Sequence, residues 1–124
     1  MTVLRLQLEL LPTNSDGRRG PVHDGYRGAI SFGETTDAGV PIVHETVLVF
    51  EGVDRLCPGE SASARAWVVA SEHLPDDVGP GTTLEYVEGY RTVARARVLE
   101  VRSDATPYPV RDTQDAKSRP LDPA

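Results

Sequence analysis

The stretch EGYRTVARARV, residues 88–98, decides the fold class because a glycine turn is followed by a two-residue period. Even positions carry small apolar residues, Ala94, Ala96 and Val98, and the arginines Arg91, Arg95 and Arg97 stand at odd positions. Side chains alternate between the two faces of a β-strand, so this period predicts a strand with one buried face. The three arginines are then predicted to share the outer face. They mark either a surface that binds a polyanion or the solvated side of the strand.

The same period recurs along the chain between clusters of turn-forming residues. In residues 3–10 leucines alternate with polar residues, and in residues 61–71 alanines alternate with larger ones. The segments predicted to be strands are residues 3–10, 26–33, 42–50, 61–71, 82–89 and 90–101. Loops rich in Gly, Pro, Asp and Thr separate them. Such strands, with edges to protect, favour an all-β fold, either a closed antiparallel β-barrel or a two-sheet sandwich.

The 124 residues suffice for one domain with its own core, which we place at residues 1–102. Residues 103–124 are rich in proline and charge and lack periodicity, which predicts an irregular, flexible tail. A single cysteine and an N-terminus whose leucines are interrupted by polar residues favour a cytoplasmic protein without a membrane span. The net charge of −6 argues against general attachment to DNA or to an anionic membrane, but it leaves room for a local contact with RNA.

No catalytic or cofactor motif is recognisable in the sequence. Phosphate-binding loops of the types G-x-x-x-x-G-K-[ST] and G-x-G-x-x-G are absent, and His23, His44 and His73 lie in separate segments without metal-ligand spacing. Cys57 precedes a Pro-Gly turn and does not open a helix, so we expect a half-buried structural thiol and not a nucleophile. We therefore expect a protein that is not an enzyme and that uses no cofactor and no metal.

Trp67 is a candidate interface anchor because alternation places it on the outer face of its strand, together with Ser63 and Arg65. A tryptophan beside an arginine is typical of protein–protein interfaces. The alternative is that loops or the proline-rich tail of the same chain cover the ring.

The chain also resembles the third, C-terminal β-barrel domain of translation elongation factor Tu. In that family a GGR-x-x-P loop leads to GYRPQFYF, then to TTDVTG, an MPGD turn and a terminal REGGRTVGAGVV. The resemblance covers residues 1 to about 102, in the family's order and with similar spacing. The matching residues are Gly17, Arg18, Pro21, Gly25, Tyr26, Arg27, Phe32, Thr35, Thr36, Asp37, Gly39, Pro58, Gly59, Glu88, Gly89, Arg91, Thr92, Val93 and Val98.

This resemblance implies a six-stranded antiparallel barrel that binds partners and does not hydrolyse GTP, because the family's nucleotide site lies in a separate N-terminal domain. The third domain in the family contacts the T-stem backbone of aminoacyl-tRNA and meets protein partners. The corresponding residues here are Tyr26, Arg27, Glu88, Gly89 and Arg91. An arginine fork suits a phosphate, and a glycine turn lets the backbone approach ribose closely.

Several residues depart from the family pattern. Gly28 and Ala29 replace Pro and Gln, and Tyr90 replaces the second turn glycine, where it either blocks the RNA or stacks on it. Arg95 and Arg97 stand where the family keeps small or apolar residues, so they either make a former interdomain surface soluble or serve a new partner. The predicted protein-partner surface therefore consists of Trp67, Tyr90, Arg95 and Arg97.

Two functions follow as hypotheses. The first is a stand-alone binding module, related to elongation factor Tu, that contacts tRNA or a protein of the translation machinery. The second is a barrel repurposed for protein interaction alone, as a mimic, an immunity or resistance factor, or a biosynthetic accessory protein.

Overall fold

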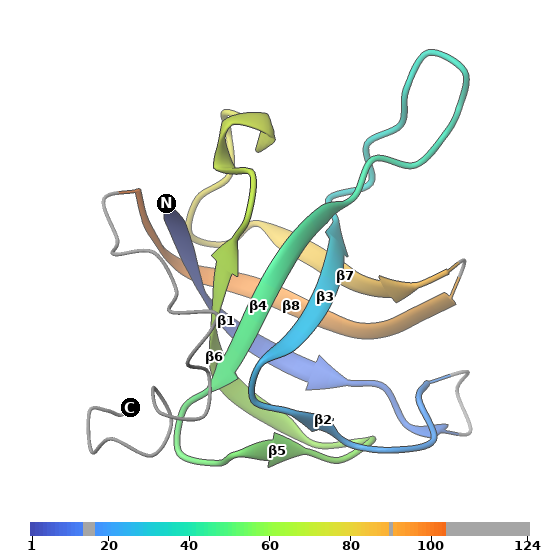
Figure 1. The fold of residues 1–124 in the computed structure, drawn as a ribbon, viewed down its shortest axis with the longest axis vertical. Coiled ribbons are helices and arrows are strands. Elements are labelled where there is room, and N and C mark those ends of the chain that lie inside the picture. The colour runs from blue at the N-terminus through green and yellow to red at the C-terminus, as the bar shows by residue number, and fades with distance from the viewer. Residues whose placement is uncertain (14–16, 90, 104–124) are drawn as a thin grey trace.

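Six strands close into an antiparallel β-barrel, which confirms the predicted all-β fold and selects the barrel over the sandwich (Figure 1). The computed structural model describes residues 1–13, 17–89 and 91–103. Predictions for Tyr90 and for residues 104–124 of the tail lie outside the described residues. Around the barrel the order is β1-β6-β4-β3-β7-β8. The barrel strands are β1 (Thr2–Leu10), β3 (Tyr26–Ser31), β4 (His44–Phe50), β6 (Ser61–Val68), β7 (Thr83–Glu88) and β8 (Arg91–Arg102).

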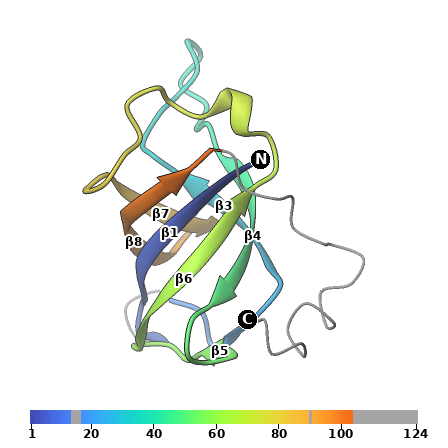
Figure 2. The same cartoon turned by 90° about the vertical axis from the view of Figure 1, so that its left-hand side faces the viewer.

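Two short elements were not predicted. Strands β2 (Val22–His23) and β5 (Arg55–Leu56) pair with each other as a two-stranded ribbon at one end of the barrel (Figures 1 and 2). Two residues are too few to show a period, so the sequence pattern does not reveal such strands. The ribbon contributes Val22 and Leu56, each 3% exposed, to the core.

Several predicted strands are longer than the observed ones, and the largest excess, three residues, is at the end of the strand predicted over residues 61–71. The strand expected over residues 61–71 ends at Val68, and a 3-10 turn, η2 (Ser71–His73), follows. The Ser71 hydroxyl donates to the Val68 carbonyl at 3.2 Å and accepts the amide of Thr2 at 2.9 Å. These contacts bend the chain away from the sheet, so the alternation of inward and outward side chains ends there.

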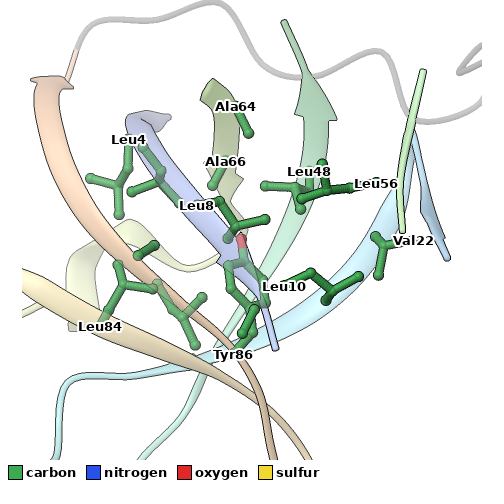
Figure 3. Packing of buried hydrophobic residues seen from close by; sticks show 14 of the residues in the cluster. Leu4, Leu8, Leu10, Val22, Leu48, Leu56, Ala64, Ala66, Leu84 and Tyr86 are labelled. Carbon is green, nitrogen blue, oxygen red and sulfur yellow. The ribbon is translucent and has the colours of Figure 1, made fainter. Parts of the chain in front are cut away.

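The barrel interior is filled by the side chains that the alternation assigns to the inner face (Figure 3). Leucines of β1 are the direct neighbours of small residues of β6, and the alanines at these positions, Ala64 and Ala66, are fully buried. Tyr86 brings a large polar group into this core. Its hydroxyl lies 3.0 Å from the hydroxyl of Thr46, which also donates to the Gly28 carbonyl. The buried oxygens are thereby satisfied.

A β-bulge interrupts β8 within the stretch of residues 88–98. Val87 pairs with Thr92 and Tyr86 pairs with Ala94, so Val93 is an extra residue on β8. Val93 and Ala94 both point into the core, 0% and 2% exposed. The extra residue inverts the alternation of β8 at this point.

The bulge divides the arginines between two faces, so the prediction that all three share one face is wrong. On the outer face, the Thr92 hydroxyl donates to Glu85 at 3.0 Å, and Arg95 Nε lies 3.8 Å from the same carboxylate. Arg97 follows Arg95 on this face. Arg91, which precedes Thr92, points the other way, along the continuation of the inner face beyond the end of the barrel.

The described residues contain no helix with the length and apolar character needed to cross a bilayer.

Candidate functional site

The continuation of the inner face at the β7–β8 turn carries a cluster of charged and aromatic side chains. Tyr26 begins β3, Glu88 ends β7 and Arg91 begins β8, so three strand ends bring them together. Arg18 joins them from the loop between β1 and β2. We call Arg18, Tyr26, Glu88 and Arg91 the Glu88 cluster.

A folded-back loop places Arg18. The Gly17 amide donates to the Pro12 carbonyl at 3.2 Å, and a Cβ at Gly17 would collide with the Leu11 carbonyl oxygen, so only glycine fits there. Arg18 then lies over the Tyr26 ring, 5.4 Å from its centroid, and its guanidinium pairs with Glu88. With 26% of its side chain exposed, Arg18 is a fixed part of the structure.

Glu88 is the single carboxylate of the cluster. It accepts the Tyr26 hydroxyl at 2.6 Å and the Arg18 guanidinium, and Arg91 Nη2 lies 3.8 Å from its other oxygen. Partial burial by itself raises the pKa of Glu88, but the hydrogen bonds from Tyr26 and Arg18 and the charges of both arginines outweigh it, so the pKa is lowered. Glu88 is therefore ionised at neutral pH and orients its donors.

Tyr26 is the neutral donor of the cluster. Burial first, and then the hydrogen bond and charge of Glu88, raise the pKa of Tyr26 to about 12, against the opposing effect of Arg18. The hydroxyl therefore keeps its proton at physiological pH and stays bonded to Glu88.

Next to the cluster lies a hollow of about 370 Å³ lined by Arg18, Arg19, Gly20, Glu88 and Arg91. Its walls carry more guanidinium groups than carboxylates, because Glu88 alone faces the arginines. Arg91 keeps 50% of its side chain exposed, and Arg19 is exposed as well. The hollow therefore has a positive surplus, although the chain as a whole carries a net charge of −6. This arrangement fits an anion such as a phosphate group.

The structure brings some of the predicted binding residues together and leaves others apart. Tyr26, Glu88 and Arg91 join the cluster, and Gly89 follows at the turn with a φ of +63°. Arg27 lies on the outer face of β3, where its guanidinium pairs with Glu45 at 2.8 Å. Its predicted RNA contact would therefore use a different surface.

Sequence reasoning missed Arg18 and Arg19 as site residues. The signal was present, since two arginines stand between glycines in GRRGP, residues 17–21, and Arg18 matches the family loop. That the loop folds back onto Tyr26 depends on packing between distant segments, which no local pattern reports.

Arg95 and Arg97 lie over a separate feature, which we call the Arg95 groove. Across the outer face Glu9 of β1, Arg95 of β8 and Glu85 of β7 are direct cross-strand neighbours. Arg97 stands one step further, between Gln7 and Thr83. The groove has a volume of about 770 Å³, and Phe32 contributes to its lining. Charges of both signs alternate here: Arg95 has a carboxylate as its neighbour on each adjacent strand, and its Nε lies 3.8 Å from that of Glu85.

Trp67 lies far along the outer face from these arginines. It is half-buried, pairs across the sheet with Val3 of β1 and Val47 of β4, and has the Arg65 guanidinium 5.5 Å from a ring centroid. The Arg95 groove belongs instead to the rows of Gln7 and Glu9, at the opposite end of β1. The predicted partner surface is therefore two surfaces, and Tyr90 lies outside the described residues.

The candidate metal ligands and the thiol lie as follows in the described part of the chain. No three His, Cys, Asp or Glu side chains there come close enough to hold a metal ion. Cys57 is half-buried, as expected, and its backbone carbonyl accepts the Glu60 amide at 3.0 Å across the Pro58-Gly59 turn.

A scan of the chain against protein-family models and a search of curated proteins find no match. The resemblance to the third domain of elongation factor Tu therefore stays a prediction from the sequence motifs, beside a barrel that the structure shows.

Proposed function

We propose that the protein is a non-catalytic binding barrel whose Glu88 cluster and adjoining hollow bind the phosphate backbone of a structured RNA of the tRNA class. The observation that carries the proposal is the local surplus of guanidinium groups around one carboxylate, on a chain that is acidic overall. The resemblance to the tRNA-contacting domain of elongation factor Tu supports the choice of tRNA. A translation-factor partner bound at the same place belongs to the same hypothesis.

The arginines of the hollow have different roles in the proposed binding. Arg18 is held by Glu88 and Tyr26 and shapes the wall. Arg19 is exposed, and Arg91, 3.8 Å from Glu88, keeps half of its side chain exposed, so both can turn toward a phosphate. Gly20 in the wall and Gly89 at the turn add no side chain, so a nucleic-acid backbone can approach the chain closely. Binding through so few charges is local, which agrees with the absence of a broad basic face in the composition.

The direct test is a titration of labelled tRNA with the wild type and with two matched variants at low salt. Arg91→Ala removes a charge at the cluster, and Arg97→Ala removes the same charge from the same strand on the outer face. We expect Arg91→Ala to weaken binding by about 1–3 kcal/mol, as for a charged hydrogen bond, and Arg97→Ala to have little effect. No binding of tRNA by the wild type at low salt, or equal weakening by both variants, would contradict the proposal.

A second candidate function, protein interaction without RNA, is favoured by the Arg95 groove. The groove is larger than the hollow beside the Glu88 cluster, and the cross-strand neighbours of Arg97, Gln7 and Thr83, carry no charge. Affinity purification from the native cell with the wild type and with Arg97→Ala separates the two functions. Loss of one specific partner with Arg97→Ala, together with no tRNA binding, would favour this candidate; recovery of chaperones alone would count against it.

A further inference from the structure

The connection between β3 and β4, residues 33–43, projects beyond the end of the barrel as a narrow hairpin (Figures 1 and 2). Thr35 and Pro41 pair across it as an isolated antiparallel bridge. The Gly39 amide closes the tip by donating to the Thr36 carbonyl at 2.8 Å. We call residues 33–43 the finger. Its own backbone hydrogen bonds give it a defined shape.

The second half of the finger carries four apolar residues in succession, Val40, Pro41, Ile42 and Val43. Val40 and Val43 are 57% and 47% exposed, the two highest values among the large hydrophobic residues described as exposed. An uninterrupted apolar run on the surface of a protein favours association, because water is excluded when the run is covered. The run therefore indicates a contact surface.

The hydrogen bonds around Pro41 indicate how this surface makes contact. The Thr36 amide donates to the Val40 carbonyl at 2.8 Å, and the Ile42 amide donates to the Glu34 carbonyl at 2.9 Å. In an antiparallel pair with this pattern the backbone groups of Pro41 face the outer edge, where proline has no N–H to donate. An added strand would lose a hydrogen bond there, so side chains make the contact.

The charge of the finger restricts what can receive it. Glu34 and Asp37 are its charged residues, and residues 33–43 contain neither Lys nor Arg. Glu34 Oε1 lies 3.5 Å from His44 Nε2 at the base of the finger, whereas Asp37 is exposed at the tip. A receiving surface therefore needs apolar atoms with a cation beside them. The same acidic character disfavours nucleic acid and anionic lipid.

The Arg95 groove offers this chemistry. Phe32 contributes to its lining, and Arg95 and Arg97 add the aliphatic parts of their side chains as well as their charges. Arg97 is exposed and its cross-strand neighbours, Gln7 and Thr83, are uncharged, so it can pair with a carboxylate from another chain. The volume of about 770 Å³ lies within the range of roughly 300–1,000 Å³ that is typical of binding pockets.

We propose that two copies of the chain associate by placing the finger of each copy in the Arg95 groove of the other. Val40 then lies against the apolar lining, and Asp37 approaches Arg97 of the other copy. Phe32 and Gly33 line the groove and lead directly into the finger, so the finger and the groove form one continuous patch. Such a patch suits a two-fold dimer, in which the same surface serves both copies. The inference goes beyond RNA binding at the Glu88 cluster and does not depend on it.

Sedimentation velocity of the full chain at rising concentration tests the association. We expect the wild type to pass from monomer to dimer. Val40→Ser should raise the midpoint concentration by at least about tenfold, because the lost apolar contact occurs twice in a two-fold dimer. The matched control Val53→Ser removes a valine that is 44% exposed, in the loop between β4 and β5, and should leave the midpoint unchanged.

Exchanging charges tests the pairing of the finger with the groove. Asp37→Arg places two cations together in each contact, and Arg97→Asp places two anions together, so each variant alone should stay monomeric. An equimolar mixture of the two variants restores one cation and one anion in both contacts of a mixed dimer. We therefore expect the mixture to dimerise at low salt and to dissociate as salt is added.

Three results would overturn the proposal. The first is a wild type that stays monomeric up to millimolar concentration. The second is a dimer that Val40→Ser and Val53→Ser weaken equally, which would place the association on another surface. The third is a mixture of Asp37→Arg and Arg97→Asp that stays monomeric, which would separate the finger from the groove.

Discussion

The two halves of β8 carry the same residue type in opposite electrostatic settings. Arg91 lies before the bulge, in a cluster where guanidinium groups outnumber the single carboxylate of Glu88. Arg95 lies after the bulge, between Glu9 and Glu85. A guanidinium flanked by carboxylates on both sides is already neutralised, whereas one that shares its carboxylate with another arginine still attracts an anion. The neighbours across the strands therefore decide which arginine is suited to bind phosphate.

The largest expected effect tests how far the Glu88 cluster depends on the barrel core. A Cβ at Gly28 would lie 2.5 Å from ring carbons of both Tyr26 and Tyr86, and Tyr86 is only 1% exposed and unable to give way. Gly28→Ala should therefore lower the free energy of unfolding by about 1–3 kcal/mol, as overpacking does, and displace Tyr26 from the cluster. Urea denaturation measures the loss.

Gly79→Ala is the matched control, because a Cβ there meets nothing within 4 Å. Gly79→Ala should leave the midpoint of urea denaturation nearly unchanged. Equal stability of the two variants would show that Tyr26 is not held by close packing around Gly28.

The next largest effect concerns charge and pH. The pKa of Glu88 in the folded protein is lowered below its ordinary value of 4.5. The ionised carboxylate therefore stabilises the folded state at pH values above 4.5, and this stabilisation is lost as the pH falls through the folded-state pKa. Glu88→Gln should cost about 1–2 kcal/mol of stability at neutral pH, since hydrogen bonds to a partly exposed charge are lost. The difference from wild type should shrink as the pH is lowered through the acid range.

The matched control on the outer face is Glu85→Gln. Glu85 is 47% exposed and pairs with Arg95 at 3.8 Å, so its replacement should change stability by less than about 1 kcal/mol. Thermal melts of both variants across the acid range make the comparison. A larger effect at Glu85 than at Glu88 would reverse the contrast between the two settings.

The smallest effect is expected at the Arg95 groove itself. Arg95→Ala combined with Arg97→Val restores small or apolar residues on an exposed strand face, so stability should change by less than about 0.5 kcal/mol. Solubility or partner binding should change instead, because the charges that keep this face hydrated are gone. A loss of several kcal/mol in urea denaturation would show that these arginines hold the fold.

The alternating residues predict the barrel because each of its strands has one face that must be buried. The bulge escapes prediction for a physical reason. Val93 is as apolar as Ala94, so either residue satisfies the core, and only pairing with β7 shows that both do. Tyr26, Glu88 and Arg91 were predicted because they match the family motifs, and the structure brings them together because they sit at neighbouring strand ends. Arg18 reaches them through a loop whose path depends on its contacts.

The most direct test of the contrast within β8 is the salt dependence of tRNA affinity for the wild type, Arg91→Ala and Arg97→Ala. Each arginine that contacts a phosphate adds about 0.7 to 0.9 to the slope of log affinity against log salt concentration. We predict that Arg91→Ala lowers the magnitude of the slope by about one such contact and that Arg97→Ala leaves it unchanged. A slope lowered by Arg97→Ala but not by Arg91→Ala would contradict the assignment of the phosphate site to the Glu88 cluster.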